Sequence, residues 1–380
     1  METLKINYVM YSTTRTGGTR TLLNFANELA KMGHDVSITT PHYDSWFQLD
    51  SGVRIITKKT SVDKYLLYGR LIINKRNYIS AHNSYLYKLM NMIPKVDINV
   101  ATFSPTAYIT SWKSIDGSVP FYHMQHFETL MTQDPMMKKF ILDTYFLPIH
   151  KIANSIWLQE KLFRLTGIKY PIVNPAVEHN VFFPHYGENA IDDGSNVVHI
   201  VALGKGGWKN AKAIYDAVEL VRKQVKNRKI VLHYFGNEPL NSIPFDGSST
   251  VFHKDLTDEQ LAELYSNSKI QITFSTAESF PLPPLEAMAC GCAVITTPYG
   301  VEDYVVNGEN ALLTQPDDID MLVSNINLLI EDDFLCEKLE KNGLKTAQRF
   351  KYSEQAKVLE REIRKARENE FFFKIQREIL

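Results

Sequence analysis

The sequence predicts an α/β protein built from two Rossmann-like, doubly wound domains. Strand-like and helix-like segments alternate from residue 4 and again from residue 197, as they do in parallel sheets. A strand–loop–helix–strand unit over residues 270–297 supports the same class. The length of 380 residues suits two or three domains, and the hydrophobic content of 44% is ordinary for a globular protein.

Composition argues against several classes of function. The net charge of -1 gives no bias toward nucleic acid, so we expect no nucleic-acid partner. No apolar run reaches the roughly 18 residues of a spanning helix, and the N-terminal segment lacks a signal-peptide layout. Cys290 and Cys292 have no second cysteine pair beside them, so buried thiols in a reducing cytoplasm fit better than zinc ligands.

The first domain opens with a strand over residues 4–11, a polar loop over 12–21 and a strand over 36–40. Between loop and strand, apolar side chains recur at helical spacing up to Gly33. The loop contains Gly17 and Gly18 but no G-x-G-x-x-G, so by itself this glycine pair indicates a tight turn more often than a ligand site.

A further strand of this domain runs over residues 120–125 and ends at His126. His123 is a rival for the role of functional histidine, and a lone histidine at a strand end is usually structural.

Residues 54–76 are strongly basic, with tyrosine, leucine and isoleucine interleaved among the charges. Asp63 is the single acidic residue of this stretch. The pattern fits either a solvated helix face over a core stripe or a peripheral contact with an anionic membrane surface, and both interpretations stay open.

An irregular, proline-containing linker over residues 172–184 leads to the second domain. A strand over 197–203 is followed by a glycine-containing loop with Lys205 and Lys209, and then by a helix over 211–225. Lysines and glycines at a helix start suit a diphosphate, and we expect both lysines to be exposed. Two solvated surface lysines are the alternative interpretation.

The 270–297 unit is the most informative stretch. Its loop should lie at the carboxyl edge of a sheet, with Pro283 and Pro284 in the first helical turn and Gly291 as a left-handed cap. Glu278 and Glu286 flank a helix start that attracts phosphate. Carboxylates beside phosphate suggest bound sugar hydroxyls, although a glutamate there could also simply favour the helix dipole.

No cluster of residues has the spacing of a metal site. Asp318 and Asp320 form a D-x-D, but they follow Pro316 at a helix start, so we expect helix capping.

The run from Glu278 to Gly291 resembles the E-x7-E signature of glycosyltransferase family 4, which comprises retaining enzymes of the GT-B fold that use nucleotide sugars. One departure is Pro281, where the family often has glycine. Proline has no N–H to donate, so the amides of Ser279, Phe280 and Leu282 are those that can contact a donor.

The resemblance implies a GT-B fold, in which two Rossmann-like domains face each other across a cleft and the C-terminal helix crosses back to the first domain. It implies an acceptor-binding domain over residues 1–174, a domain that binds the nucleotide sugar over 175–355, and the returning helix over 356–380. By the same resemblance the Gly17-Gly18 loop faces the donor phosphates and the acceptor.

The resemblance also assigns roles to side chains. It places His126 near the donor sugar, and Lys205 and Lys209 on the donor diphosphate. Glu278 orients the donor sugar and Glu286 holds the ribose. The implied catalytic group is Glu278, His126, Lys205 and Lys209, and the implied donor-binding group is Gly17, Gly18, Lys205, Lys209, Glu278, Ser279, Phe280, Leu282 and Glu286.

The implied activity is metal-independent transfer of a hexosyl or deoxyhexosyl group, with retention, from a nucleotide-diphosphate sugar to an acceptor hydroxyl. The implied acceptor is a glycan or a lipid-linked glycan of a bacterial or archaeal cell surface, met in the cytoplasm or at the inner face of the membrane. No cofactor is implied beyond the donor substrate. A nucleotide-sugar epimerase of the same fold and a non-catalytic nucleotide-sugar-binding protein remain as alternatives.

Overall fold

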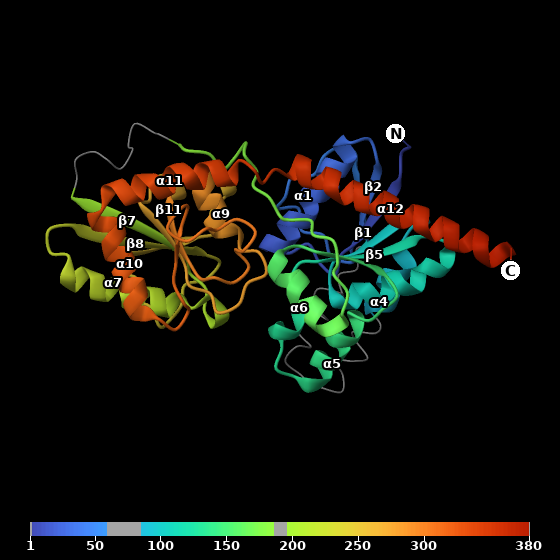
Figure 1. The fold of residues 1–380 in the computed structure, drawn as a ribbon, viewed down its shortest axis with the longest axis horizontal. Coiled ribbons are helices and arrows are strands. Elements are labelled where there is room, and N and C mark those ends of the chain that lie inside the picture. The colour runs from blue at the N-terminus through green and yellow to red at the C-terminus, as the bar shows by residue number, and fades with distance from the viewer. Residues whose placement is uncertain (1, 59–84, 186–195, 380) are drawn as a thin grey trace. The chain divides into compact units, whose positions relative to one another are not determined.

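The computed structural model describes residues 2–58, 85–185 and 196–379, and the chain forms two compact units. The first unit comprises Met1–Asn154, Leu158–Asn174 and Tyr352–Leu380, and the second comprises Ser155–Trp157 and Pro175–Lys351. Each unit contains one six-stranded parallel sheet with helices packed against it (Figure 1). The predicted α/β class with two Rossmann-like units is confirmed.

The sheet of the first unit has the strand order β3-β2-β1-β4-β5-β6. The order reverses between β1 and β4, and ligands of such folds bind at the carboxyl ends of the strands around that reversal. The strands are β1 Lys5–Val9, β2 Asp35–Thr39, β3 Val53–Ile56, β4 Ile98–Ala101, β5 Val119–Met124 and β6 His150–Ala153. The helices are α1 Gly17–Lys31, α4 Ser104–Lys113, α5 Pro135–Thr144, α6 Ile156–Thr166 and α12 Tyr352–Ile379, with short 3-10 turns η1 Ser114–Asp116 and η2 Glu128–Met131 and a helical segment over residues 85–92.

The sheet of the second unit has the order β12-β11-β10-β7-β8-β9, so its reversal lies between β7 and β10. Helix α7 lies beside α10 and α9 beside α11, with the strands between the two pairs (Figure 1). The strands are β7 Val197–Leu203, β8 Lys229–Gly236, β9 Thr250–Lys254, β10 Ile270–Thr273, β11 Ala293–Thr296 and β12 Leu312–Leu313. The helices are α7 Ala211–Gln224, α8 Asp258–Ser266, α9 Leu282–Ala289, α10 Ile319–Glu331 and α11 Asp333–Ala347, with the 3-10 turn η3 Gly207–Lys209.

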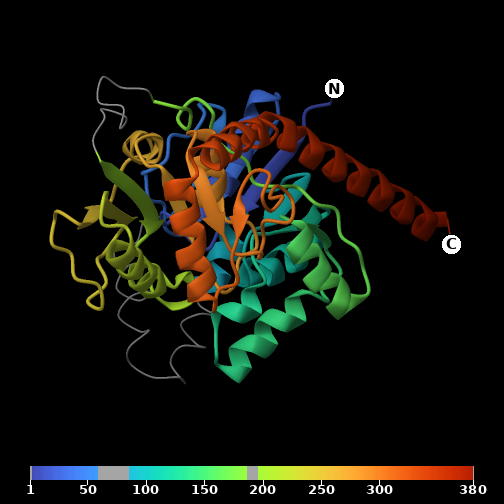
Figure 2. The ribbon, with the colours of Figure 1, turned by 60° about the vertical axis from the view of Figure 1, so that its left-hand side comes forward.

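The C-terminal helix α12 belongs to the first unit, as the resemblance to GT-B enzymes predicted. It packs against α1, where the ring of Tyr352 meets Phe25 edge-on at 5.6 Å between centroids. Its apolar stripe of Ala356, Leu359, Ile363 and Ala366 is buried, which explains why a highly charged segment docks there. In Figures 1 and 2 the helix starts beside the first unit and continues to the C-terminal end.

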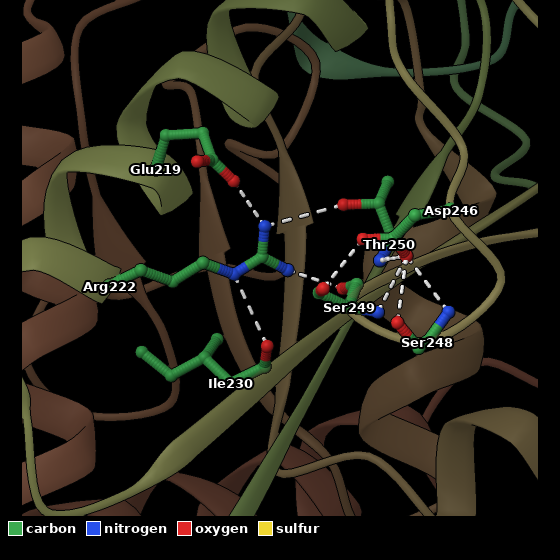
Figure 3. A network of polar contacts seen from close by, with 7 residues as sticks. All are labelled: Glu219, Arg222, Ile230, Asp246, Ser248, Ser249 and Thr250. Atoms are coloured by element: carbon green, nitrogen blue, oxygen red, sulfur yellow. Dashed lines mark hydrogen bonds and ion pairs between the residues drawn. The ribbon is translucent and has the colours of Figure 1, made fainter.

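Arg222 fixes α7 to the edge of the second sheet (Figure 3). Its guanidinium donates to the carbonyl of Ile230 at 3.2 Å and to the hydroxyl of Thr250 at 3.3 Å, and it also contacts Glu219 and the carbonyl of Ser249. Asp246 accepts the amides of Ser248, Ser249 and Thr250, so the turn before β9 is held from both sides. The helix that follows the lysine-bearing loop is therefore firmly anchored.

One local prediction is wrong, and another falls mostly outside the described residues. Helix α1 begins at Gly17, because the hydroxyl of Thr16 accepts the amide of Thr19 at 3.2 Å and caps the helix. Gly17 and Gly18 are therefore the first helical residues rather than part of a loop. Residues 53–56 form strand β3, and most of the basic stretch, from residue 59 to 76, lies outside the described residues. Within the described ranges, no helix combines the length and apolarity needed to cross a bilayer.

Candidate functional site: a carboxylate–lysine cluster at the sheet reversal

Two buried carboxylates lie in the second unit, one in the loop before α9 and one within that helix. Glu278 is 8% exposed in the preceding loop, and Glu286 is 5% exposed within the helix. Pro283 and Pro284 occupy the first turn as predicted, because helix termini tolerate a residue without an N–H. The helix ends at Ala289, and Gly291, which follows the capping residue Cys290, has the predicted left-handed conformation with a φ of 81°.

Lys209 pairs directly with Glu278. The Nζ atom of Lys209 contacts the Oε1 atom of Glu278, and the two side chains are only 18% and 10% exposed. Lys209 ends the η3 turn after β7, whereas Glu278 follows β10, which is the neighbouring strand in the sheet. The structure therefore brings together two residues that the sequence assigned to one site from separate motifs.

Lys205 lies in the same loop but behaves differently. Its side chain is exposed, and its Nζ atom lies 5.6 Å from the centroid of the Trp208 ring. The carbonyl of Trp208 accepts the amide of Thr276 at 2.8 Å, which ties this loop to the loop after β10. The expectation that both lysines are exposed is correct for Lys205 and wrong for Lys209, because Glu278 holds the ammonium of Lys209 against the protein.

A small pocket opens beside the ion pair at the sheet reversal. It lies where β7 and β10 end and where α9 begins, so strand ends and a helix N-terminus converge on it. An anion held there would meet a lysine and the positive end of a helix dipole. The pocket is lined by Leu203, Lys209, Ile214, Ile272, Thr273, Phe274, Ser275, Pro281 and Pro283.

The loop between β10 and α9 carries Glu278, and we call it the carboxylate loop. The segment that follows β11 packs against this loop and hydrogen-bonds to it. Tyr304 donates its hydroxyl to the carbonyl of Pro281 at 2.8 Å. Burial, and then the negative charges of Glu278 and its acidic neighbours, raise the pKa of Tyr304 well above 10. Gly300 passes so close to this loop that a Cβ atom on it would lie 2.6 Å from the backbone of Ser279. Only glycine fits there.

The remaining predicted donor contacts lie in this same loop and helix start. Ser279 is 2% exposed, and Leu282 is the first residue of α9. The ring of Phe280 is buried and packs on Tyr304 and Phe350 at 5.2 and 5.9 Å between centroids. The ring of Phe280 is thus a core group, which leaves its backbone amide as the part that could meet a ligand.

Burial, together with the nearby charge of Glu286, raises the pKa of the Cys290 thiol to about 12, so this cysteine stays a thiol.

The first unit carries a second group of predicted residues. Gly17 and Gly18 form the N-terminus of α1, and a Cβ atom on Gly18 would lie 3.6 Å from the Cβ atom of Gln125. His126 follows Gln125 in the loop after β5 and is half-buried. The glycine pair and the His126 loop are therefore neighbours in space at the carboxyl ends of the strands.

His123, the rival histidine, is a core residue. It is fully buried in β5, and its ring packs on Phe25 at 5.1 Å between centroids. Burial lowers the pKa of His123 to about 4, so it is neutral at physiological pH.

Asp318 of the D-x-D caps a helix, as expected, and Asp320 lies in the first turn of that helix. The carboxylate of Asp318 accepts the amide of Met321 at 2.8 Å at the start of α10. Within the described part of the chain, no group of three or more histidine, cysteine, aspartate or glutamate side chains is placed to hold a metal ion.

Sequence reasoning gave no role to Gly300 or Glu128. The close approach of Gly300 to Ser279 arises only where two loops meet in the folded chain, so no local pattern indicates it. Glu128 stands two residues after His126 and is 2% exposed. Burial raises the pKa of Glu128 to about 7, which no local pattern could indicate.

The structure has the fold of GT-B glycosyltransferases. It is similar to the crystal structure of Anabaena Alr3699/HepE in complex with UDP-glucose, with a TM-score of 0.72 and 17% identity, over 95% of this chain and 100% of that chain. It is also similar to WaaG, a glycosyltransferase involved in lipopolysaccharide biosynthesis, with a TM-score of 0.71 and 11% identity, over 93% of this chain and 98% of that one.

Residues 187–346 match the family model described as glycosyl transferases group 1, and these residues lie within the second unit. The chain is 26% identical over 157 residues to the serotype-specific mannosyltransferase WbdA of Escherichia coli, covering 39% of this chain and 19% of the relative. It is 25% identical over 255 residues to the N,N'-diacetylbacillosaminyl-diphospho-undecaprenol alpha-1,3-N-acetylgalactosaminyltransferase of Campylobacter jejuni, covering 62% of this chain and 65% of that enzyme. The matched segments thus span less than two thirds of each of these relatives.

Proposed function

We propose that this chain is a glycosyltransferase that moves a sugar from a nucleotide-diphosphate sugar to an acceptor hydroxyl with retention of the anomeric configuration. The observation that carries the proposal is the Lys209–Glu278 pair at the reversal of the second sheet. A buried carboxylate and a lysine beside a helix N-terminus provide contacts for both halves of such a donor, because the carboxylate accepts sugar hydroxyls and the cation binds phosphate.

In this proposal the second unit binds the donor. Lys205 and Lys209 offset the negative charge that grows on the leaving diphosphate, so they act most strongly in the transition state. Glu278, with the amides of Ser279, Phe280 and Leu282, orients the donor sugar, and Glu286 holds the ribose. Charge compensation by lysines and a helix N-terminus also supports a metal-independent reaction.

The first unit binds the acceptor. We assign Gly17 and Gly18 to contacts with the donor phosphates and the acceptor, and His126 to the donor sugar, on the resemblance of the sequence alone. The names of two of the relatives support the proposed classes of sugar and acceptor. WbdA is a mannosyltransferase, which favours a hexosyl group, and the Campylobacter enzyme has an undecaprenol-linked acceptor in its name, which favours a lipid-linked glycan. We therefore place the chain in bacterial surface glycan synthesis, in the cytoplasm, with a peripheral contact at the inner face of the membrane.

The test begins with thermal unfolding of the full chain in a panel of nucleotide sugars, since a ligand that binds the native state raises its stability. The stabilising donor is then incubated with and without glycan acceptors. Transfer that requires an acceptor, with an unchanged anomeric configuration by NMR, supports the proposal. Conversion of the sugar without an acceptor would instead indicate an epimerase, and stabilisation without turnover a binding protein.

A further inference from the structure

The loop that carries His126 is held on both sides by buried groups of the first unit. Before His126, the carbonyl of Gln125 accepts the side-chain amide of Asn154 at 2.9 Å. After it, the ring of Phe127 stacks on Tyr145 at 5.3 Å between centroids with an interplanar angle of 23°. The hydroxyl of Tyr145 also accepts the backbone amide of Glu128 at 2.9 Å.

The side chain of Glu128 is the centre of this arrangement. Its carboxylate accepts the hydroxyl of Tyr122 at 2.5 Å and the backbone amide of Ser104 at 2.9 Å. Tyr122 lies in β5 and Ser104 is the first residue of α4. One side chain thus joins a strand, a helix start and the His126 loop.

A buried carboxylate is a costly choice if its only task is to fill space, since an apolar side chain would pack without losing hydration. The groups that act on this carboxylate are Tyr122, Tyr145 and Ser104, and none of them is a charged side chain. Its hydrogen bonds therefore fix the position of the loop backbone in a way that packing alone would not.

We propose that Glu128 is a positioning residue, which holds the loop so that His126 keeps the orientation required for the sugar transfer proposed above. This inference rests on that proposed function, in which His126 meets the donor sugar. Glu128 itself touches no substrate, because it is buried behind the loop.

The protonation of Glu128 should alter the loop. The carboxylate form accepts both hydrogen bonds, but the neutral acid has one O–H that must donate. The amide of Ser104 can only donate, so the O–H of the neutral acid must point to the hydroxyl of Tyr122 or of Ser104, and that hydroxyl then becomes the acceptor. Burial raises the pKa of Glu128 to about 7, and this change of direction therefore falls in the physiological range.

The test uses the full chain with 13C-labelled histidine, in which His126→Asn identifies the ring signals of His126. We expect Glu128→Gln and Tyr122→Phe to move those signals. The control Tyr108→Phe removes a hydroxyl that donates to the carbonyl of Phe140 at 2.8 Å in the same unit, and it should leave the signals of His126 in place. Unfolding midpoints establish that each variant is folded.

In transfer assays, Glu128→Gln should lower kcat about 10- to 100-fold with little change in the KM of the donor, since a displacement of about 1 Å costs up to about 100-fold. It should also remove an inflection near pH 7 from the pH profile of kcat. If Glu128→Gln does not fold, Tyr122→Phe carries the test alone. His126 signals that stay in place in the folded variants overturn the inference. If the variants shift the His126 signals but the parent protein has no transfer activity, the proposed function is overturned and the positioning of the loop by Glu128 still holds.

Discussion

Lys209 and Glu278 are 69 positions apart in sequence and form an ion pair that is largely withdrawn from solvent. The pair joins the loop after β7 to the loop after β10, at the reversal of the strand order. A donor diphosphate would draw Lys209 toward itself and leave Glu278 to accept sugar hydroxyls. Under the proposed function, this ion pair would therefore prepare the site before the donor binds and then take part in binding it.

Removing the ammonium group of Lys209 should test both the proposed preparation of the site and the proposed binding of the donor. We expect Lys209→Ala to lower kcat by the equivalent of about 2.7–4 kcal/mol. Removing one preorganised hydrogen-bonding group from a site where negative charge develops typically costs that much transition-state stabilisation. Lys205→Ala should lower kcat as well. In a double-mutant cycle measured by kcat/KM, Lys209→Ala and Glu278→Gln should be strongly non-additive, whereas Lys205→Ala and Glu278→Gln should be nearly additive.

The exposed Lys212 of α7 offers a matched control. It pairs with Asp216 one turn along the helix, with 47% and 45% of the two side chains exposed. Lys212→Ala should leave the kinetics unchanged. Near-parent activity of both Lys205→Ala and Lys209→Ala would mean that the donor site lies elsewhere.

Glu286→Gln should weaken donor binding more than turnover. A ribose contact is similar in the ground and transition states, so its loss raises KM and changes kcat little. Steady-state kinetics with the donor varied at saturating acceptor measure both constants. An unchanged KM with a collapsed kcat would contradict a ribose role and assign Glu286 to the chemical step.

Chelation should leave activity intact. Under the proposed function, Lys205, Lys209 and the N-terminus of α9 supply the positive charge that a divalent ion supplies in other phosphate sites. Initial rates in EDTA should equal those in added Mg²⁺ or Mn²⁺. A loss of activity that either metal restores would refute the metal-independent reaction.

Gly300→Ala should destabilise the second unit and weaken the proposed donor binding. Its φ of 72° strains any other residue, and its Cβ atom would lie 2.6 Å from Ser279. The control is Gly308→Ala, where φ is 74° but nothing lies within 4 Å. We expect about 1 kcal/mol for the control and clearly more for Gly300→Ala, measured by urea unfolding. Equal losses of unfolding free energy in the two variants would show that the carboxylate loop can move aside for the added Cβ atom at no energetic cost.

The stability of the protein should report the titration of Glu128. Its pKa in the folded state is about 7, above the ordinary value of 4.5, so folding favours the neutral acid. This contribution is fully present below about pH 4.5 and is lost as the pH rises through 7, on the order of 1 to 3 kcal/mol. Relative to the parent, Glu128→Gln should therefore become more stable as the pH rises. Urea unfolding at pH 5 and pH 8 measures the difference, and parallel stability curves would contradict it.

Much of the fold could be predicted because local pattern and global structure agree. The strand expected over residues 197–203 is β7 Val197–Leu203, and its apolar run is dictated by burial between helices. The prolines at the start of α9 and the left-handed Gly291 behave as their backbone chemistry requires. The start of α1 was predicted too late, because Thr16 caps a helix that begins with two glycines.

The amino-acid pattern alone was enough to place Lys205 and Lys209 after one strand, Glu278 after another and His126 after a third. It could not show that Lys209 pairs with Glu278 while Lys205 stays exposed, or that Glu128 is buried. The difference lies in the range over which the interactions act. Backbone preference and periodicity act over a few residues, whereas ion pairing and desolvation depend on which strands become neighbours when the sheet assembles.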